Sequence, residues 1–116
     1  MNIEIKTFEQ FLNSNDIFTL YVDALFGIGF RDNFSGIYLK IAKKINSLQK
    51  KVYAIDIPSG LNANTGVAVK SAIKADKTIT FGLPKKGFFI NNGPNLCGEI
   101  IVKNIGFPKQ LLKLYK

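Results

Sequence analysis

The stretch Val52-Tyr53-Ala54-Ile55-Asp56-Ile57-Pro58-Ser59-Gly60 decides the fold of this chain. Residues 52–57 are mostly apolar, which is typical of a strand that is covered on both faces of a parallel sheet. Pro58 ends the strand because it has no N–H to donate to a neighbouring strand. The stretch therefore predicts a buried strand with an acid, Asp56, close to its carboxyl end.

An amphipathic helix precedes this strand, and another strand precedes the helix. The helix is marked by apolar side chains at helical spacing on one face, namely Ile37, Ile41, Ile45 and Leu48. Residues 17–26 form a nearly continuous apolar run with one acid, which predicts a strand covered on both faces. Strand, helix and strand in this order predict the α/β class, with a parallel sheet built from right-handed crossovers.

Weaker patterns complete the expected order of elements. Residues 2–6 alternate apolar and polar side chains, which predicts a short strand, and residues 7–12 have helical spacing behind Thr7 as a cap. The asparagines and glycines of residues 60–66 predict a loop. Further elements are expected after this loop: strands at 78–81 and 99–102, a Pro-, Lys- and Gly-rich connection at 82–98, and a short helix at 108–115.

The composition is that of a single small globular domain spanning residues 1–116. Hydrophobic residues make up 47% of the chain and charged residues 21%, which excludes an intrinsically disordered protein. No apolar run approaches the roughly 20 residues that cross a bilayer. The segment after Met1 has no secretory signal pattern. We therefore expect a cytoplasmic protein with no membrane partner.

The net charge of +8 raises nucleic acid as a partner. The lysines are dispersed, however, and lack the interleaved aromatic side chains of an RNA-binding strand. A solvated basic surface explains this pattern better than a specific nucleic-acid site. The same field would favour an anionic ligand such as a phosphate-bearing nucleotide.

Cysteine and histidine usage limits the chemistry. Cys97 is the single cysteine and the chain has no histidine, so an internal disulfide is impossible and a structural zinc site is nearly excluded. Without a histidine to activate it, Cys97 is expected to be a small, half-buried apolar residue and not a nucleophile.

Two acids lie near the carboxyl ends of predicted strands, where ligands bind in open parallel sheets. Asp56 can point from the sheet rim into a cleft, where it can exchange protons near neutral pH. Alternatively, it caps the following turn by accepting backbone N–H bonds, a common use of Asp before Pro, Ser and Gly. Spacing supports the two roles of Asp56 equally, whereas for Asp23 the structural role, a carboxylate held by backbone donors, is better supported.

Gly27-Ile28-Gly29 follows the first long strand. It resembles the start of a dinucleotide-binding glycine fingerprint, but no third glycine follows at the required spacing. Two glycines after a parallel strand let the backbone approach a ligand closely, with Arg31 available for an anionic group. A simple turn is the alternative.

Several blocks of sequence, in order along the chain, resemble the NAD(P)HX epimerase domain, the YjeF N-terminal family. They are residues 22–29, 54–66, 75–82, 85–87, 97–100 and 104–108. The Asp-Ile-Pro-Ser-Gly block at residues 56–60 is the most specific of them. The resemblance implies a Rossmann-like three-layer sandwich with a mostly parallel sheet, and it covers nearly the whole chain.

Enzymes of this family interconvert the R and S forms of hydrated NADH or NADPH, called NADHX and NADPHX, so that a stereospecific dehydratase can repair both. The resemblance implies that Asp56 contacts the substrate, and that Asp23 and Ser59 help to bind a potassium ion. It also implies substrate contacts from one loop, formed by Gly27, Ile28, Gly29, Phe30, Arg31, Asp32 and Asn33.

The chemistry of this reaction suits an acid/base side chain. The hydrated carbon bears a hydroxyl beside the ring nitrogen, so the nitrogen can help to expel the hydroxyl once an acid protonates it. We assign that acid/base role to Asp56. No redox step or metal hydroxide is required, in keeping with the absence of histidine and of clustered cysteines.

The chain departs from the family pattern at its amino-terminal side. The family domain begins with a helical region and a strand, followed by a loop of the form Gly-Asn-Asn-Gly-Gly-Asp-Gly that holds substrate phosphate and a potassium ligand. Nothing in residues 1–22 matches this loop. We therefore expect a domain truncated at its amino-terminal side, with an uncovered sheet edge and sheet face that favour association with another chain.

Three functions follow from these observations. The first is half of an epimerase, in which Asp56 works once a separate amino-terminal half, or a second copy in a homo-oligomer, completes the site. The second is a non-catalytic nucleotide- or protein-binding module of the same fold, or a decaying gene remnant. The third is nucleic-acid binding driven by charge, which ranks lowest because the lysines are dispersed.

Overall fold

The computed structural model describes residues 3–26, 36–104 and 106. Four parallel strands form one sheet in the order β1-β2-β3-β4, with bounds Leu20–Asp23, Lys51–Ile55, Lys77–Phe81 and Glu99–Lys103. The helical elements are α1 (Phe8–Asn13), α2 (Gly36–Leu48), the short 3-10 helix η1 (Lys86–Phe88) and α3 (Gly93–Cys97). The α/β class and the parallel sheet are confirmed.

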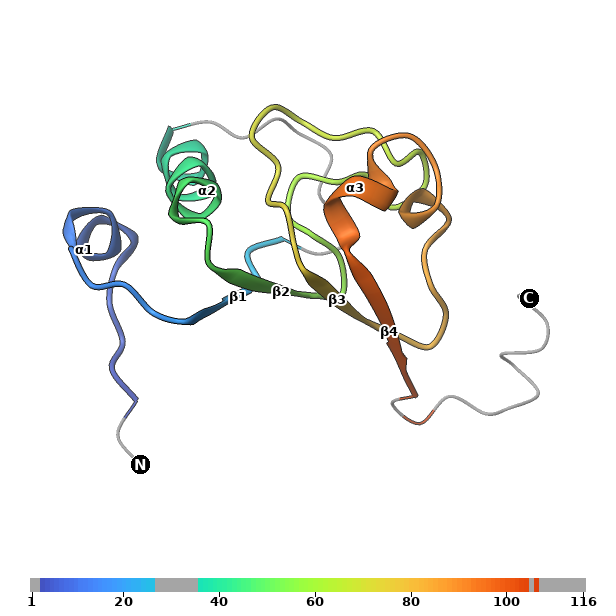
Figure 1. Cartoon of the computed structure of the whole chain (residues 1–116), viewed down its shortest axis with the longest axis horizontal. Coiled ribbons are helices and arrows are strands. Elements are labelled where there is room, and N and C mark those ends of the chain that lie inside the picture. The colour runs from blue at the N-terminus through green and yellow to red at the C-terminus, as the bar shows by residue number, and fades with distance from the viewer. Residues whose placement is uncertain (1–2, 27–35, 105, 107–116) are drawn as a thin grey trace.

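The helices lie on one face of the sheet. Figure 1 shows α1, α2 and α3 on the same side of the strands. The strands follow one another in sequence order, and connections between parallel strands almost always have the same hand, so each connection returns over the same face. The strand side chains on that face are buried, including Val52, Ala54, Thr78 and Thr80.

The opposite face of the sheet is uncovered among the described residues. In β1, Leu20 is 42% exposed and Val22 is 59% exposed. Tyr53 and Ile79 on the neighbouring strands are only half-buried. The prediction of a first strand covered on both faces was therefore wrong for this part of the chain, because the described helices supply only one of the two outer layers of a three-layer sandwich.

Two apolar clusters form the core between the sheet and the helical layer. In the first, Ala42 of α2 packs with Val52 of β2 and with Ile73 from the connection between β2 and β3. The second is made of Ile57, Leu61, Phe88 and Cys97, which are all buried. Both clusters adjoin the turn that follows β2, because Ile57 and Leu61 flank Ser59 in the chain and the N–H of Ile73 donates to the carbonyl oxygen of Ser59 at 3.0 Å.

Several predicted elements differ from those in the structure. Residues 3–6 form no strand, since no described strand lies beside them to pair with, and Ile3 and Ile5 are exposed. The helix behind Thr7 is confirmed, with a reciprocal capping box between Thr7 and Gln10. The connection at 82–98 contains η1 and α3, which were not predicted because the segment is rich in glycine and proline. The helix expected at 108–115 lies outside the described residues.

Lys44 of α2 holds the end of α1. Its ammonium donates hydrogen bonds to the carbonyl oxygens of Phe11 at 2.5 Å and Ser14 at 2.9 Å, and it lies 4.4 Å from the centroid of the Phe11 ring. The last carbonyl oxygens of a helix have no partner inside the helix and carry partial negative charge, so a cation is favourable there. Lys44 thereby attaches α1 to the rest of the fold.

Replacing Lys44→Met is expected to lower the free energy of unfolding by about 1–3 kcal/mol, because hydrogen bonds from a charged donor are lost. Urea denaturation followed by far-UV circular dichroism measures this change. The adjacent Lys43 is exposed, so Lys43→Met is the matched control. Equal effects of the two substitutions would contradict the attachment of α1 by Lys44.

Candidate functional site

The site is built at the carboxyl edge of the sheet. Asp23 is the last residue of β1, and Asp56 follows the last residue of β2. The backbone N–H of Asp56 continues the ladder by donating to the carbonyl oxygen of Ile79 in β3 at 2.7 Å. Parallel strands end at the same edge, which brings these two acids and Thr80, near the end of β3, to one side of the sheet.

Asp23 and Ser59 form a buried hydrogen-bonded pair that ties β1 to the turn after β2. The Ser59 hydroxyl donates to Asp23 Oδ1 at 2.6 Å, and the Ser59 backbone N–H donates to Asp23 Oδ2 at 2.7 Å. The Leu25 N–H also donates to Oδ1, at 3.2 Å, and Ser59 Oγ accepts from the Phe26 N–H at 3.0 Å. The structural role foreseen for Asp23, a carboxylate held by backbone donors, is confirmed.

Burial governs the charge of Asp23. The residue is 4% exposed, and this desolvation raises the pKa of its carboxyl above the ordinary value of 3.8. The hydrogen bonds from Ser59 and Leu25 act in the opposite direction because they favour the carboxylate, but desolvation is the larger effect. Asp23 therefore resists ionisation more than a solvated aspartate does.

Asp56 has a different environment, because its partners are side chains. Its Oδ1 accepts from the Lys85 ammonium at 2.5 Å and from the Thr80 hydroxyl at 3.4 Å. The Lys85 ammonium also donates to Thr80 Oγ1, at 2.6 Å. Within the described residues no backbone N–H donates to the Asp56 carboxylate, so the turn-capping role is not the one observed.

The backbone of Asp56 is in the left-handed region, with φ of 72°. This conformation is uncommon for a residue with a side chain and costs about 1–3 kcal/mol. Strained residues of this kind persist where the surrounding structure holds them, and they concentrate at functional sites. Here the Ile79 carbonyl holds the backbone and Lys85 holds the side chain.

Lys85 reaches Asp56 because two loops are in backbone contact. The N–H of Gly87 donates to the carbonyl oxygen of Ala63 at 2.6 Å, and the N–H of Asn92 donates to the carbonyl oxygen of Gly66 at 2.8 Å. A Cβ atom on Gly87 would lie 2.3 Å from the carbonyl oxygen of Asn62, so only glycine allows this approach. These backbone hydrogen bonds hold the loop after β2 against the segment that carries Lys85.

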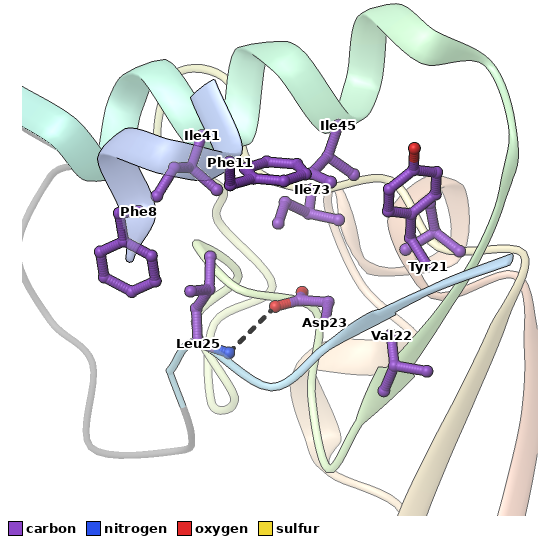
Figure 2. Close-up of a pocket in the computed structure, with 10 residues that line it drawn as sticks. Phe8, Phe11, Tyr21, Val22, Asp23, Leu25, Ile41, Ile45 and Ile73 are labelled. Atoms are coloured by element: carbon purple, nitrogen blue, oxygen red, sulfur yellow. Dashed lines mark hydrogen bonds between the residues drawn. The ribbon is translucent and has the colours of Figure 1, made fainter. Parts of the chain in front are cut away.

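A separate apolar pocket of about 200 Å³ lies beside Asp23. Figure 2 shows Phe11, Ile45 and Ile73 around it, with Asp23 at one side. Neither Asp56 nor Lys85 lines this pocket. It therefore adjoins the Asp23–Ser59 pair and not the charged cluster at Asp56.

The structure brings the predicted residues Asp23, Asp56 and Ser59 to one edge of the sheet. The predicted loop from Gly27 to Asn33 lies outside the described residues. Lys85 was not among the predicted site residues. Its position, four residues after the end of a strand and in a Gly- and Pro-rich connection, was the only indication in the sequence. The lysines were interpreted together as a dispersed basic surface.

Cys97 is buried, more completely than expected. Its exposure is 0%, and burial raises the pKa of its thiol to about 11.

Nowhere in the described residues do three Asp, Glu, Cys or His side chains gather as metal ligands do. None of the described helices has the length and apolar character needed to cross a membrane.

Comparison with known proteins identifies the family. The model of the family described as YjeF-related protein N-terminus matches residues 1–87. The chain belongs to this family. This YjeF-related chain is 44% identical over 88 residues to the NAD(P)H-hydrate epimerase of Leuconostoc citreum and 43% identical over 97 residues to that of Lentilactobacillus buchneri. It is also 42% identical over 97 residues to the bifunctional NAD(P)H-hydrate repair enzyme of Thermofilum pendens.

The YjeF-related chain spans less than half the length of these relatives. The match covers 76% of the chain but 40% of the Leuconostoc epimerase, and 83% of the chain but 45% of the Lentilactobacillus epimerase. For the Thermofilum repair enzyme it covers 84% of the chain and 18% of the relative. Strand β4 lies beyond the family match and still pairs with β3, so the sheet continues past residue 87.

The raised pKa of Asp23 predicts a specific pH dependence of stability. At pH values between 3.8 and the raised folded value, the folded state binds more protons than the unfolded state, so stability falls as pH rises. Asp23→Asn cannot ionise and should lack this fall. Urea denaturation at several pH values above 3.8 measures both curves, with the exposed Asp16→Asn as control. Parallel curves for wild type and Asp23→Asn would refute the assignment.

Proposed function

We propose that this chain supplies the acid/base part of an NAD(P)H-hydrate epimerase site, which interconverts the R and S forms of NADHX and NADPHX. The observation that carries the proposal is the Asp56 carboxylate, held at the carboxyl edge of the sheet by Lys85 and Thr80. Family membership and the names of the relatives support the same reaction.

In the proposed reaction, Asp56 carries one proton. As a carboxylic acid it protonates the hydroxyl of the hydrated ring carbon, the C–O bond breaks, and the lone pair of the ring nitrogen forms a C=N bond while water departs. Water then adds to the other face of that carbon and returns a proton to the Asp56 carboxylate. The atoms balance without an oxidant or a reductant.

The remaining substrate contacts are assigned to the loop from Gly27 to Asn33, as the family resemblance implies. The net charge of +8 favours the phosphates of a dinucleotide near this basic chain. Such a nucleotide substrate is an intracellular metabolite, and we therefore place the protein in the cytoplasm.

A potassium ion is proposed at Asp23 and Ser59. Carboxylate, hydroxyl and carbonyl oxygens are the ligands that hard cations take, and this pair supplies the first two. The pair uses most of its capacity internally, because Oδ1 accepts two hydrogen bonds and Ser59 Oγ both donates and accepts. Oδ2, which accepts only the Ser59 N–H among the described residues, is left as the ligand, with backbone carbonyls completing the set.

We assign the uncovered sheet face to a separate amino-terminal half, with residues 1–116 as one partial domain. More than half the length of each epimerase relative lies outside the match, which is enough for a further layer. Parallel sheets are normally covered on both faces, and this face presents Leu20 and Val22. The outer edge of β1 also has no described neighbour, so it can pair with a strand of the partner.

The epimerase proposal predicts exchange between NADHX epimers when this chain is mixed with the unmatched part of the Leuconostoc citreum epimerase. Exchange spectroscopy by NMR should show a rate above that without protein, and Asp56→Asn should lower it by about 100-fold or more, because proton transfer is lost. The exposed Asp16→Asn is the matched control and should retain the rate.

Other outcomes of this mixture separate the alternatives. No exchange, or equal exchange with Asp56→Asn, would refute the catalytic proposal. Calorimetric binding of NADH, NADPH or AMP without exchange would indicate a binding module. Sedimentation velocity should show a complex of the two pieces, whereas self-association of this chain alone would indicate a homo-oligomer.

The potassium proposal predicts a cation-specific gain in stability. The thermal midpoint should be higher in potassium chloride than in choline chloride at equal ionic strength, because a ligand that binds only the folded state stabilises it. Asp23→Asn removes the negative charge of the carboxylate that supplies the Oδ2 ligand and should abolish the difference. Equal midpoints for the wild type in both salts would refute the site.

A further inference from the structure

The ion pair between Lys85 and Asp56 differs from the other ion pairs among the described residues. Its side chains are only 18% and 25% exposed, and the nitrogen and oxygen are 2.5 Å apart. The pair of Lys77 and Glu99 is typical of the rest, with side chains 39% and 65% exposed at 3.7 Å. Removing two charges from water is costly, and such a pair contributes little net stability. Its presence calls for another explanation.

Among the described residues, the groups around the pair donate hydrogen bonds to one oxygen of the Asp56 carboxylate and not to the other. Lys85 and the fully buried Thr80 both donate to Oδ1. Among the described residues, no group donates to Oδ2. The carboxylate is therefore fixed in orientation through one oxygen, while the second oxygen remains able to exchange a proton with a ligand.

The position of Lys85 is set by its own segment. Its carbonyl oxygen accepts from the Phe88 N–H at 3.1 Å, which closes η1, and Gly87 is bonded to Ala63 in the loop after β2. Lys85 and Asp56 thus belong to two segments that are already joined through their backbones. The fold itself therefore positions the ammonium, and such preorganisation lowers the cost of reaction.

We propose that Lys85 is a positioning residue for the Asp56 carboxyl group. It orients the group through Oδ1, and its positive charge stabilises the carboxylate that forms when the proton passes to the leaving hydroxyl. This inference rests on the proposed acid/base function of Asp56 and adds a residue to it. Thr80 completes the arrangement by accepting a second hydrogen bond from Lys85.

The first test detects the pair without any activity. NMR spectra selective for lysine ammonium groups should contain a Lys85 signal with slowed proton exchange, because this ammonium is partly buried and hydrogen-bonded to two oxygens; Lys44, bonded to two carbonyl oxygens, should give a second slowed signal. The Lys85 signal should disappear in Lys85→Met, shift in Asp56→Asn and persist in Lys86→Met, the exposed neighbour. Absence of the Lys85 signal in the wild-type chain would overturn the proposal.

The second test measures epimer exchange in the mixture with the unmatched epimerase part. Lys85→Met should lower kcat by about 100-fold with little change in KM, since the contact acts on proton transfer and not on substrate binding. Lys86→Met should retain the wild-type kcat. Ethylamine should restore part of the rate of Lys85→Ala, which a merely structural residue would not allow.

The outcomes distinguish this inference from the proposed function. No exchange with the wild-type chain overturns the epimerase function, and the role of Lys85 falls with it. Exchange by the wild type with an equal kcat for Lys85→Met overturns the role of Lys85 alone. If Lys85→Met loses its folded circular dichroism spectrum, Lys85→Arg decides: retained ammonium-like charge should preserve most of kcat, and a loss as large as that of Lys85→Ala would overturn the proposal.

Discussion

Sequential order in a parallel sheet is the constraint on which the rest of this structure depends. Each strand is followed in space by the next strand in the chain, so each connection has to cross over the sheet. Because crossovers share one hand, they collect on one face, where α2 and α3 lie over the strands (Figure 1). The site and the uncovered face are two consequences of the same topology.

The two acids at the carboxyl edge show how environment separates residues of one chemical type. Asp23 is buried and held by Ser59 and Leu25, so it ties β1 to the turn after β2. Asp56 has a strained backbone, a partly exposed side chain and a lysine partner. The first carboxyl supports the turn that follows the second in the chain.

Close backbone contact through glycine joins the segments that form the cluster at Asp56. At Gly66, Gly87 and Gly93 an added Cβ atom would lie 2.2, 2.3 and 1.9 Å, respectively, from the nearest carbonyl oxygen. The contacts at Gly66 and Gly87 join segments that are far apart in sequence, as in the hydrogen bond between Ala63 and Gly87. Lys85 is carried to Asp56 by this packing and not by proximity along the chain.

The sequence by itself determined the class of the fold, the ends of β2, β3 and β4 to within a residue or two, and the acids at the sheet edge. Those features follow from local patterns: apolar runs, helical spacing, and a proline that ends a strand. It also indicated the family, since the block at residues 56–60 is specific. Local patterning could not reveal η1 and α3, whose short helices depend on contacts with the loop after β2.

Only the tertiary structure decided which groups surround Asp56 and which face of the sheet stays uncovered. The sequence left open whether Asp56 caps the turn or acts as an acid/base group, because both roles suit an Asp before Pro, Ser and Gly. The turn cap is not the contact observed, because the described donors to the Asp56 carboxylate are Thr80 of β3 and Lys85 of the segment after it. Such partners are set by strand register and loop packing, which act between residues far apart in the chain.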